Sequence, residues 1–135
     1  MKTKQLIIEK TSPFDVAITV EKLIEAASKK GWQNPANHNF EQSLAKSGKV
    51  VRPIQVVEIC KPEYSGNMLE KSDERIVSIM MPCRLSVYEK EDGKVYVALL
   101  NMAEISTGLP EAAIKAIDAA TAESFEIVNS VIGVN

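Results

Sequence analysis

The segment from residue 83 to residue 101 constrains the fold most, because it alternates apolar and polar residues on both sides of a strong turn signal. The apolar positions are Cys83, Leu85 and Val87, followed by Val95, Val97 and Leu99. Successive side chains of a strand point to opposite faces, so each set lies on one face. The dipeptide Asp92-Gly93 between the two sets is typical of a tight hairpin turn. The sequence therefore predicts an antiparallel hairpin with one buried face.

The N-terminal part of the chain predicts a strand followed by a helix. Residues 4–10 are an apolar-rich stretch bounded by charges, which indicates a strand. Ser12 can cap the helix, with Pro13 in its first position, and Gly31 is typical of the residue after a last turn. We expect Trp32 to fold back onto that last turn and to pack there.

The middle of the chain predicts a second hairpin. Residues 33–39 have the composition of a loop, since proline and asparagine favour turns. Residues 40–46 alternate weakly, and residues 50–60 are rich in β-branched side chains, with a Gly48 turn between them. Pro53 has no N–H to donate, so we expect its strand to lie at a sheet edge or to contain a bulge.

Two helices complete the predicted fold. A short one begins at Pro62 and continues to about residue 71, and a long amphipathic one opens within residues 107–110. The expected inward positions of the long helix are Ile114, Ile117, Thr121, Phe125 (or Ser124), Val128 and Ile132. Residues 1–135 are thus expected to form a single α+β domain. Its antiparallel sheet has helices packed on one face, in the order β-α-β(4)-α with the short helix inserted near residues 62–71.

Charge and composition exclude several classes of partner. Sixteen Lys and Arg against eighteen Asp and Glu give a net charge of −2, so the chain has no general cationic field for nucleic acid. Its N-terminus has no apolar run long enough for a signal peptide or a membrane span. We therefore expect a cytoplasmic protein without a nucleic-acid or membrane partner, whose two cysteines stay reduced.

Three segments resemble a known family. They are 59-ICKP-62, 68-MLE-70 and 80-MMPCRLSVYEKEDGKVYVALLN-101. These segments resemble the bacterial and archaeal domain of unknown function family 302, and the similarity of pattern covers nearly the whole chain. The resemblance implies a TATA-box-binding-protein-like fold and a homodimer. It implies no activity, and a fold shared with a DNA-binding protein does not indicate DNA binding.

Cys60, Cys83 and His38 are the candidates for thiol or metal chemistry. Cys60 precedes the helix start at Pro62, where the helix dipole lowers a thiol pKa, and Arg84 follows Cys83. Two thiolates and an imidazole would suit a soft metal or a redox pair. Neither cysteine belongs to a Cys-x-x-Cys motif, however, and unpaired cysteine is often buried. The interpretation as packed thiols is therefore favoured.

The sequence contains no motif for hydrolysis or phosphate binding, and only one histidine to serve as a general base. We expect a homodimer that binds a ligand or a partner without catalysis and without a resident cofactor. The alternative is a thiol-dependent redox or soft-metal-binding protein that uses Cys60 and Cys83. The identity of a small-molecule ligand stays open.

Overall fold

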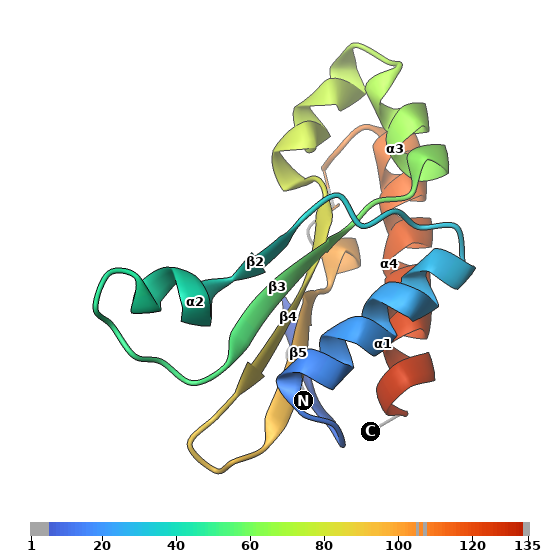
Figure 1. Ribbon diagram of the computed structural model, residues 1–135. Coiled ribbons are helices and arrows are strands. Elements are labelled where there is room, and N and C mark those ends of the chain that lie inside the picture. The colour runs from blue at the N-terminus through green and yellow to red at the C-terminus, as the bar shows by residue number, and fades with distance from the viewer. Residues whose placement is uncertain (1–5, 105, 107, 134–135) are drawn as a thin grey trace, which may run out of the picture.

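One antiparallel sheet and a layer of helices form the molecule (Figure 1). The computed structural model describes residues 6–104, 106 and 108–133. In chain order the elements are β1 (Ile7–Ser12), α1 (Val16–Lys29), β2 (Asn37–Asn39), α2 (Phe40–Ala45), β3 (Ile54–Ile59), α3 (Pro62–Leu69), the 3₁₀ helix η1 (Asp73–Met80), β4 (Cys83–Glu89), β5 (Val95–Leu100), the 3₁₀ helix η2 (Met102–Glu104) and α4 (Glu111–Ile132).

The strands follow the order β1-β5-β4-β3-β2, and every neighbouring pair is antiparallel. Helices α1 and α4 lie side by side on one face of the sheet, whereas α3 and η1 extend beyond its end (Figure 1). Neither α1 nor α4 covers the opposite face, which we call the outer face, and near the start of β3 Phe40 and Leu44 of α2 line an open hollow together with Ile54 and Tyr88. The predicted α+β class, with an antiparallel sheet and helices on one face, is confirmed.

The predicted hairpin is formed by β4 and β5. Leu85 and Val87 of β4 are buried, together with the three predicted apolar positions of β5. At the turn, Gly93 has a φ of +80°, a conformation that favours glycine, and the Asp92 side chain accepts a hydrogen bond from the Lys94 N–H at 2.8 Å. These residues fix the register of the two strands.

Helix α1 begins three residues later than expected. Asp15 caps it by accepting a hydrogen bond from the Ile18 N–H at 2.8 Å, and Ser12 is instead the last residue of β1. The expected strand over residues 4–10 is observed as Ile7–Ser12, and residues 4 and 5 lie outside the described residues. The Ser12 hydroxyl bonds that of Thr19 at 2.7 Å, which connects β1 to α1.

The end of α1 agrees with the sequence. Gly31 has a φ of +84°, and the Trp32 N–H donates to the carbonyl of Ala27 at 3.0 Å. Trp32 thereby folds back into the core, where its side chain is 5% exposed.

The prediction for residues 37–46 is wrong. The expected loop contains the short strand β2, and the expected strand over residues 40–46 is the helix α2. Asn39 caps α2 by accepting from the Gln42 N–H at 3.0 Å, and Gly48, with a φ of +82°, follows its end. The asparagine and the glycine are helix-terminating signals at both ends of this segment.

Pro53 does not place its strand at an edge, contrary to expectation. β3 lies between β4 and β2, because Pro53 precedes the first paired residue and removes no bond from the ladder. Its carbonyl still accepts from the Glu89 N–H at 3.0 Å.

Helix α4 presents small and branched residues to the sheet and to α1 and α3. Its buried residues are Ala113, Ala116, Ile117, Ala120, Thr121, Ser124, Ile127, Val128 and Ile132. Ile114 and Phe125 are half-buried rather than buried, and Ser124, which was the alternative to Phe125, is buried. Thr107, at the expected opening, lies outside the described residues. The helix begins after Pro110.

Candidate functional site

The strands β4 and β5 separate at one end of the sheet. Their last paired residues are Leu85 and Leu99. Beyond this point Arg84 pairs only with Glu58 of β3, and Leu100 pairs only with Ile7 of β1. The two central strands thus fork, and each continues with its other neighbour. The Met81–Pro82 peptide, which precedes β4 here, is cis.

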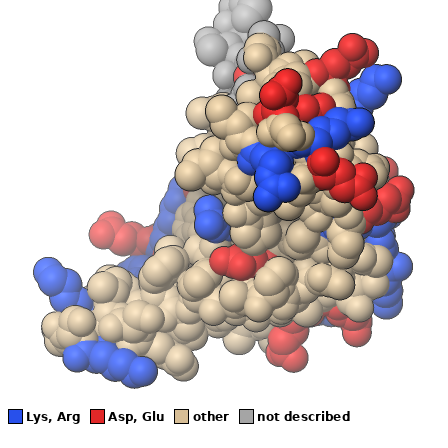
Figure 2. Space-filling view, turned by 90° about the horizontal axis from the view of Figure 1, so that it is seen from above, with Lys and Arg blue, Asp and Glu red and all other residues tan. Residues whose placement is uncertain are grey.

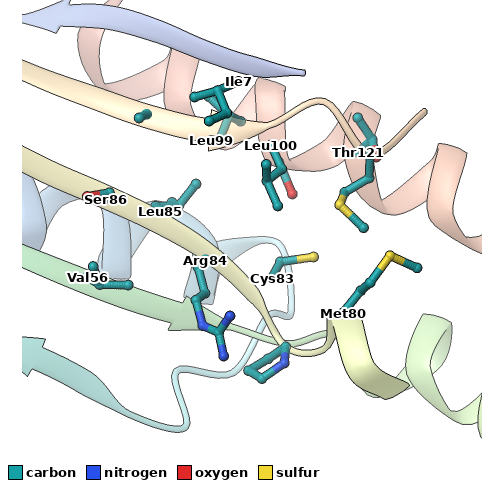
Figure 3. A pocket seen from close by; sticks show the side chains of 14 residues that line it. Ile7, Val56, Met80, Cys83, Arg84, Leu85, Ser86, Leu99, Leu100 and Thr121 are labelled. Atoms are coloured by element: carbon teal, nitrogen blue, oxygen red, sulfur yellow. The ribbon is translucent and has the colours of Figure 1, made fainter. Parts of the chain in front are cut away.

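A cleft of about 280 Å³ lies at this fork, and we call it the fork cleft (Figure 3). It is lined by Ile7, Val56, Met80, Pro82, Cys83, Arg84, Leu85, Ser86, Ala98, Leu99, Leu100, Met102, Thr121 and Ser124. Most of these side chains are apolar, and a few polar groups lie among them. That combination is characteristic of small-molecule sites, and the volume is at the small end of their range.

Sulfur atoms form one wall of the fork cleft. Figure 3 shows the Cys83 thiol and the Met80 thioether pointing into the space between the forked strands and α4. Met102 lines the cleft as well, and a smaller cavity beside it is lined by Met68 and Met81. Methionine is flexible and polarizable, so this wall can adapt to ligands of different shape.

The structure brings Cys60 and Cys83 close together. Both are free thiols, half-buried, and both line a small cavity next to Trp32. Cys60 precedes α3 as expected, and its thiol donates to the Ser65 hydroxyl at 3.6 Å. Burial, with a smaller contribution from Cys60, raises the pKa of the Cys83 thiol from 9.0 to about 11. The Cys83 thiol therefore stays protonated at neutral pH, which disfavours nucleophilic chemistry.

Arg84 and His38 are not part of the site formed by the two thiols. Arg84 is exposed on the outer face, and its side chain points away from Cys83 in Figure 3. His38 lies in β2, where its Nε2 is 2.8 Å from the Glu58 carboxylate. Within the described residues no group of three or more His, Cys, Asp or Glu side chains is arranged to hold a metal ion.

Thr121 is the polar residue that stands out in the cleft wall. It is 7% exposed, and its hydroxyl has no hydrogen-bond partner among the described residues. Ser124, one turn further along α4, also lines the cleft, but its hydroxyl donates to the Ala120 carbonyl at 2.9 Å. A buried polar group without a partner is rare and costs free energy, so it is a candidate for contact with a ligand. The sequence identified Thr121 only as a core position.

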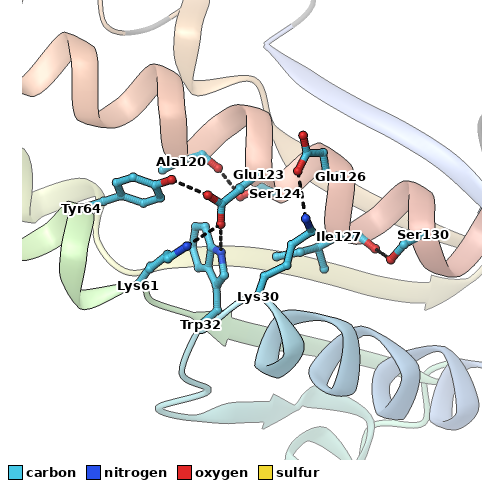
Figure 4. A network of polar contacts seen from close by, with 10 residues as sticks. All are labelled: Lys30, Trp32, Lys61, Tyr64, Ala120, Glu123, Ser124, Glu126, Ile127 and Ser130. Carbon is cyan, nitrogen blue, oxygen red and sulfur yellow. Dashed lines mark hydrogen bonds and ion pairs between the residues drawn. The ribbon is translucent and has the colours of Figure 1, made fainter.

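A second polar cluster surrounds Glu123 on the other side of α4 (Figure 4). The carboxylate accepts from Trp32 Nε1 at 2.7 Å, from Lys61 Nζ at 3.0 Å and from the Tyr64 hydroxyl. Burial alone would raise the pKa of Glu123, but the three donors outweigh it and lower the pKa to about 2. The hydrogen bond that the Tyr64 hydroxyl donates to Glu123 is also the main cause that raises the pKa of Tyr64 to about 12.

This Glu123 cluster was missed from the sequence, because its members come from three separate segments. Trp32 follows α1, Lys61 caps α3, Tyr64 lies within α3, and Glu123 lies within α4. The indole and phenol rings also contact each other edge to face, with centroids 6.1 Å apart. Every polar atom of the cluster is satisfied within it, so we assign the cluster to holding these segments together.

Two further properties concern the surface and the helices. On the face seen in Figure 2, acidic and basic side chains are interspersed and do not gather into one basic patch. Among the described residues, no helix combines the length and the apolar character that crossing a membrane requires.

Comparison with known proteins agrees with this architecture. The model of the family described as "Domain of unknown function DUF302" matches residues 8–130. The crystal structure of an uncharacterized conserved protein DUF302 from Bacillus stearothermophilus superposes with a TM-score of 0.84, at 15% sequence identity. The match covers 95% of this chain and 99% of that one. No curated protein matches the chain. Because the family model covers most of the sequence, the chain belongs to the family of domain of unknown function DUF302.

Proposed function

We propose that the protein acts in the cytoplasm and binds a small apolar molecule in the fork cleft without transforming it. The observation that carries this proposal is the cleft itself, an opening of about 280 Å³ between the forked ends of β4 and β5. The free energy of an apolar molecule would fall on its transfer from water into the cleft, so binding there would be favourable. The interspersed charges of Figure 2 also favour a small-molecule ligand over nucleic acid.

The thiols belong to the wall of the site in this proposal. The raised pKa of Cys83 supports a packing role, because a thiol must lose its proton to act as a nucleophile or a zinc ligand. The proximity of Cys60 is the observation in favour of the redox alternative. The rate at which Cys83 reacts with an alkylating reagent distinguishes the packing role from the redox alternative.

The proposal is tested by titrating ¹⁵N-labelled protein with naphthalene, a compact probe without polar atoms. We expect amide shifts to be concentrated at Cys83, Leu99 and Thr121. Ser86→Phe should weaken binding at least tenfold, because Ser86 lines the cleft and a larger side chain fills it. Ser78→Phe is the matched control, since Ser78 is exposed on η1. Wild-type protein that shows no such shifts, or equal effects of both variants, would refute the proposal.

We also propose that two copies of the chain associate through the outer face. Its apolar side chains come from three strands of the sheet, and they are Ile7, Ile54, Val56, Ala98 and Leu100, of which all but Ile54 also line the fork cleft. Ile7 is 60% exposed and Leu100 is 46% exposed. A second copy would remove such a surface from water, and a two-fold axis would present the same patch on both partners.

A further inference from the structure

We propose that the molecule bound in the fork cleft carries one uncharged oxygen, a hydroxyl or a carbonyl, that hydrogen-bonds with the hydroxyl of Thr121. This inference rests on the proposed function, because it specifies the chemistry of the ligand of the same cleft. Thr121 lines the cleft from α4, and among the described residues its buried hydroxyl has no partner.

The contrast between Thr121 and Ser124 supports this assignment. A hydroxyl on a helix can donate to the carbonyl one turn earlier, as Ser124 does to Ala120 at 2.9 Å. The Thr121 hydroxyl makes no such bond with a described residue, although it is equally buried, with exposures of 7% and 6%. Ser86 of β4 also lines the cleft with a hydroxyl, but of the two buried hydroxyls that α4 contributes, that of Thr121 is the one without a bond to a described residue.

The walls around Thr121 favour an uncharged ligand group. The neighbouring lining residues Cys83, Leu99 and Met102 offer no charge to pair with, and burying an unpaired charge is costly. The cationic lining residue, Arg84, is exposed on the outer face. An uncharged ligand oxygen can hydrogen-bond with the Thr121 hydroxyl and brings no unpaired charge into these walls.

The volume limits the size of the ligand. An apolar protein cavity of about 150 Å³ holds benzene, so the fork cleft, with about 280 Å³, has room for roughly ten to twelve non-hydrogen atoms. A bicyclic aromatic alcohol is of this size, and the methionine wall can adapt to a flat ring.

The test compares three probes that share one ring system: naphthalene, 2-naphthol and the larger 2-naphthoate. Dissociation constants are measured by NMR titration of the full chain. We expect 2-naphthol to bind about fivefold more tightly than naphthalene, because it adds one hydrogen bond to a neutral group. We expect 2-naphthoate to bind more weakly than naphthalene, because its charge must be buried.

Two variants assign the preference to one hydroxyl. Thr121→Val keeps the shape of the side chain and should remove the preference for 2-naphthol, which is measured as the ratio of the dissociation constants of naphthalene and 2-naphthol for the same variant. Ser124→Ala is the matched control and should keep the preference, because the Ser124 hydroxyl is already bonded. Retained naphthalene binding also shows that each variant is folded with an intact cleft.

The outcomes distinguish the two proposals. Equal binding of naphthalene and 2-naphthol to the wild-type protein would overturn the inference about Thr121 and leave the apolar site standing. A preference that persists in Thr121→Val would overturn it as well. If naphthalene itself does not bind, the proposed function fails, and the inference fails with it.

Discussion

At the scale of single residues, the buried hydroxyls of Thr121 and Thr19 provide a pair with opposite expectations. Thr121 has no partner among the described residues, whereas the Thr19 hydroxyl bonds that of Ser12 at 2.7 Å. Thr121→Val should therefore raise the free energy of unfolding by about 1 kcal/mol, and Thr19→Val should lower it by a similar amount. Thermal unfolding measures both, with expected shifts of roughly 3–6 °C in opposite directions. Two shifts of the same sign would contradict this account.

Cys83 carries the second prediction at this scale. Because burial and Cys60 raise its pKa to about 11, only about one part in a thousand of the Cys83 thiol is ionised at pH 8. In a Cys60→Ser background burial, the larger cause, remains, so the reaction of Cys83 with iodoacetamide should still be slow at pH 8 and should accelerate about tenfold per pH unit until the pH reaches the raised pKa of the thiol. The unfolded chain in urea is the control and should react much faster. Rapid reaction of the folded protein at pH 8 would favour the redox alternative.

The fork shows what residue patterns cannot reveal. Alternation places Leu85 and Leu99 on the buried face, and this was predicted, but the same alternation continues to Cys83, where β4 has already separated from β5. The end of the pairing depends on where β3 and β1 draw the two strands apart, which is a tertiary effect. The missing partner of Thr121 is likewise invisible from the sequence, because hydrogen-bond satisfaction depends on neighbours far along the chain.

At the scale of elements, the Glu123 cluster holds α3 and the segment after α1 against α4. Glu123→Gln keeps the size of the side chain but removes the charge that three donors contact. We expect the free energy of unfolding to fall by about 1–2 kcal/mol, an estimate reduced because the carboxylate is partly exposed. Glu126→Gln is the control on the same helix, since its ion pair with Lys30 is largely exposed, and it should change stability little.

The pH dependence of this contribution follows from its sign. The pKa of Glu123 is lowered in the folded protein from 4.5 to about 2, so folding favours the ionised carboxylate. Its stabilisation is complete above pH 4.5 and is lost as the pH falls towards 2. Urea unfolding of the wild type and Glu123→Gln between pH 2 and 7 should therefore show a difference that shrinks below pH 4.5. A constant difference would rule out the charge as its source.

Element prediction succeeded where one periodicity dominated and failed where the signals were short. The β4–β5 hairpin and helices α1 and α4 were predicted because their apolar positions repeat over at least two turns or strands, and α3 was predicted because Pro62 suits a first helical position. Helix α2 has six residues and no buried side chain, so its apolar pattern carried no information. Its caps, Asn39 and Gly48, were present in the sequence, but both residues are also common in loops.

At the scale of the whole molecule, the sheet has two faces with different environments. One is covered by α1 and α4, and the outer face leaves Ile7 and Leu100 among its exposed residues (Figure 1). Ile7 of β1 and Leu100 of β5 are paired across the two strands, and both are apolar. They therefore form a continuous apolar surface at that end of the sheet. We therefore expect this face to determine whether the protein is a monomer or a dimer in solution.

A charge at this surface should separate the two copies. We expect the wild-type chain to sediment as a dimer at tens of micromolar, and Ile7→Lys to shift it towards monomer, because a buried unpaired ammonium opposes association. Ile76→Lys is the matched control: Ile76 is 68% exposed, against 60% for Ile7, but lies on η1 beyond the sheet. Sedimentation velocity at several concentrations measures the change. A monomeric wild type would refute association, and equal effects of both variants would place the contact elsewhere than the outer face.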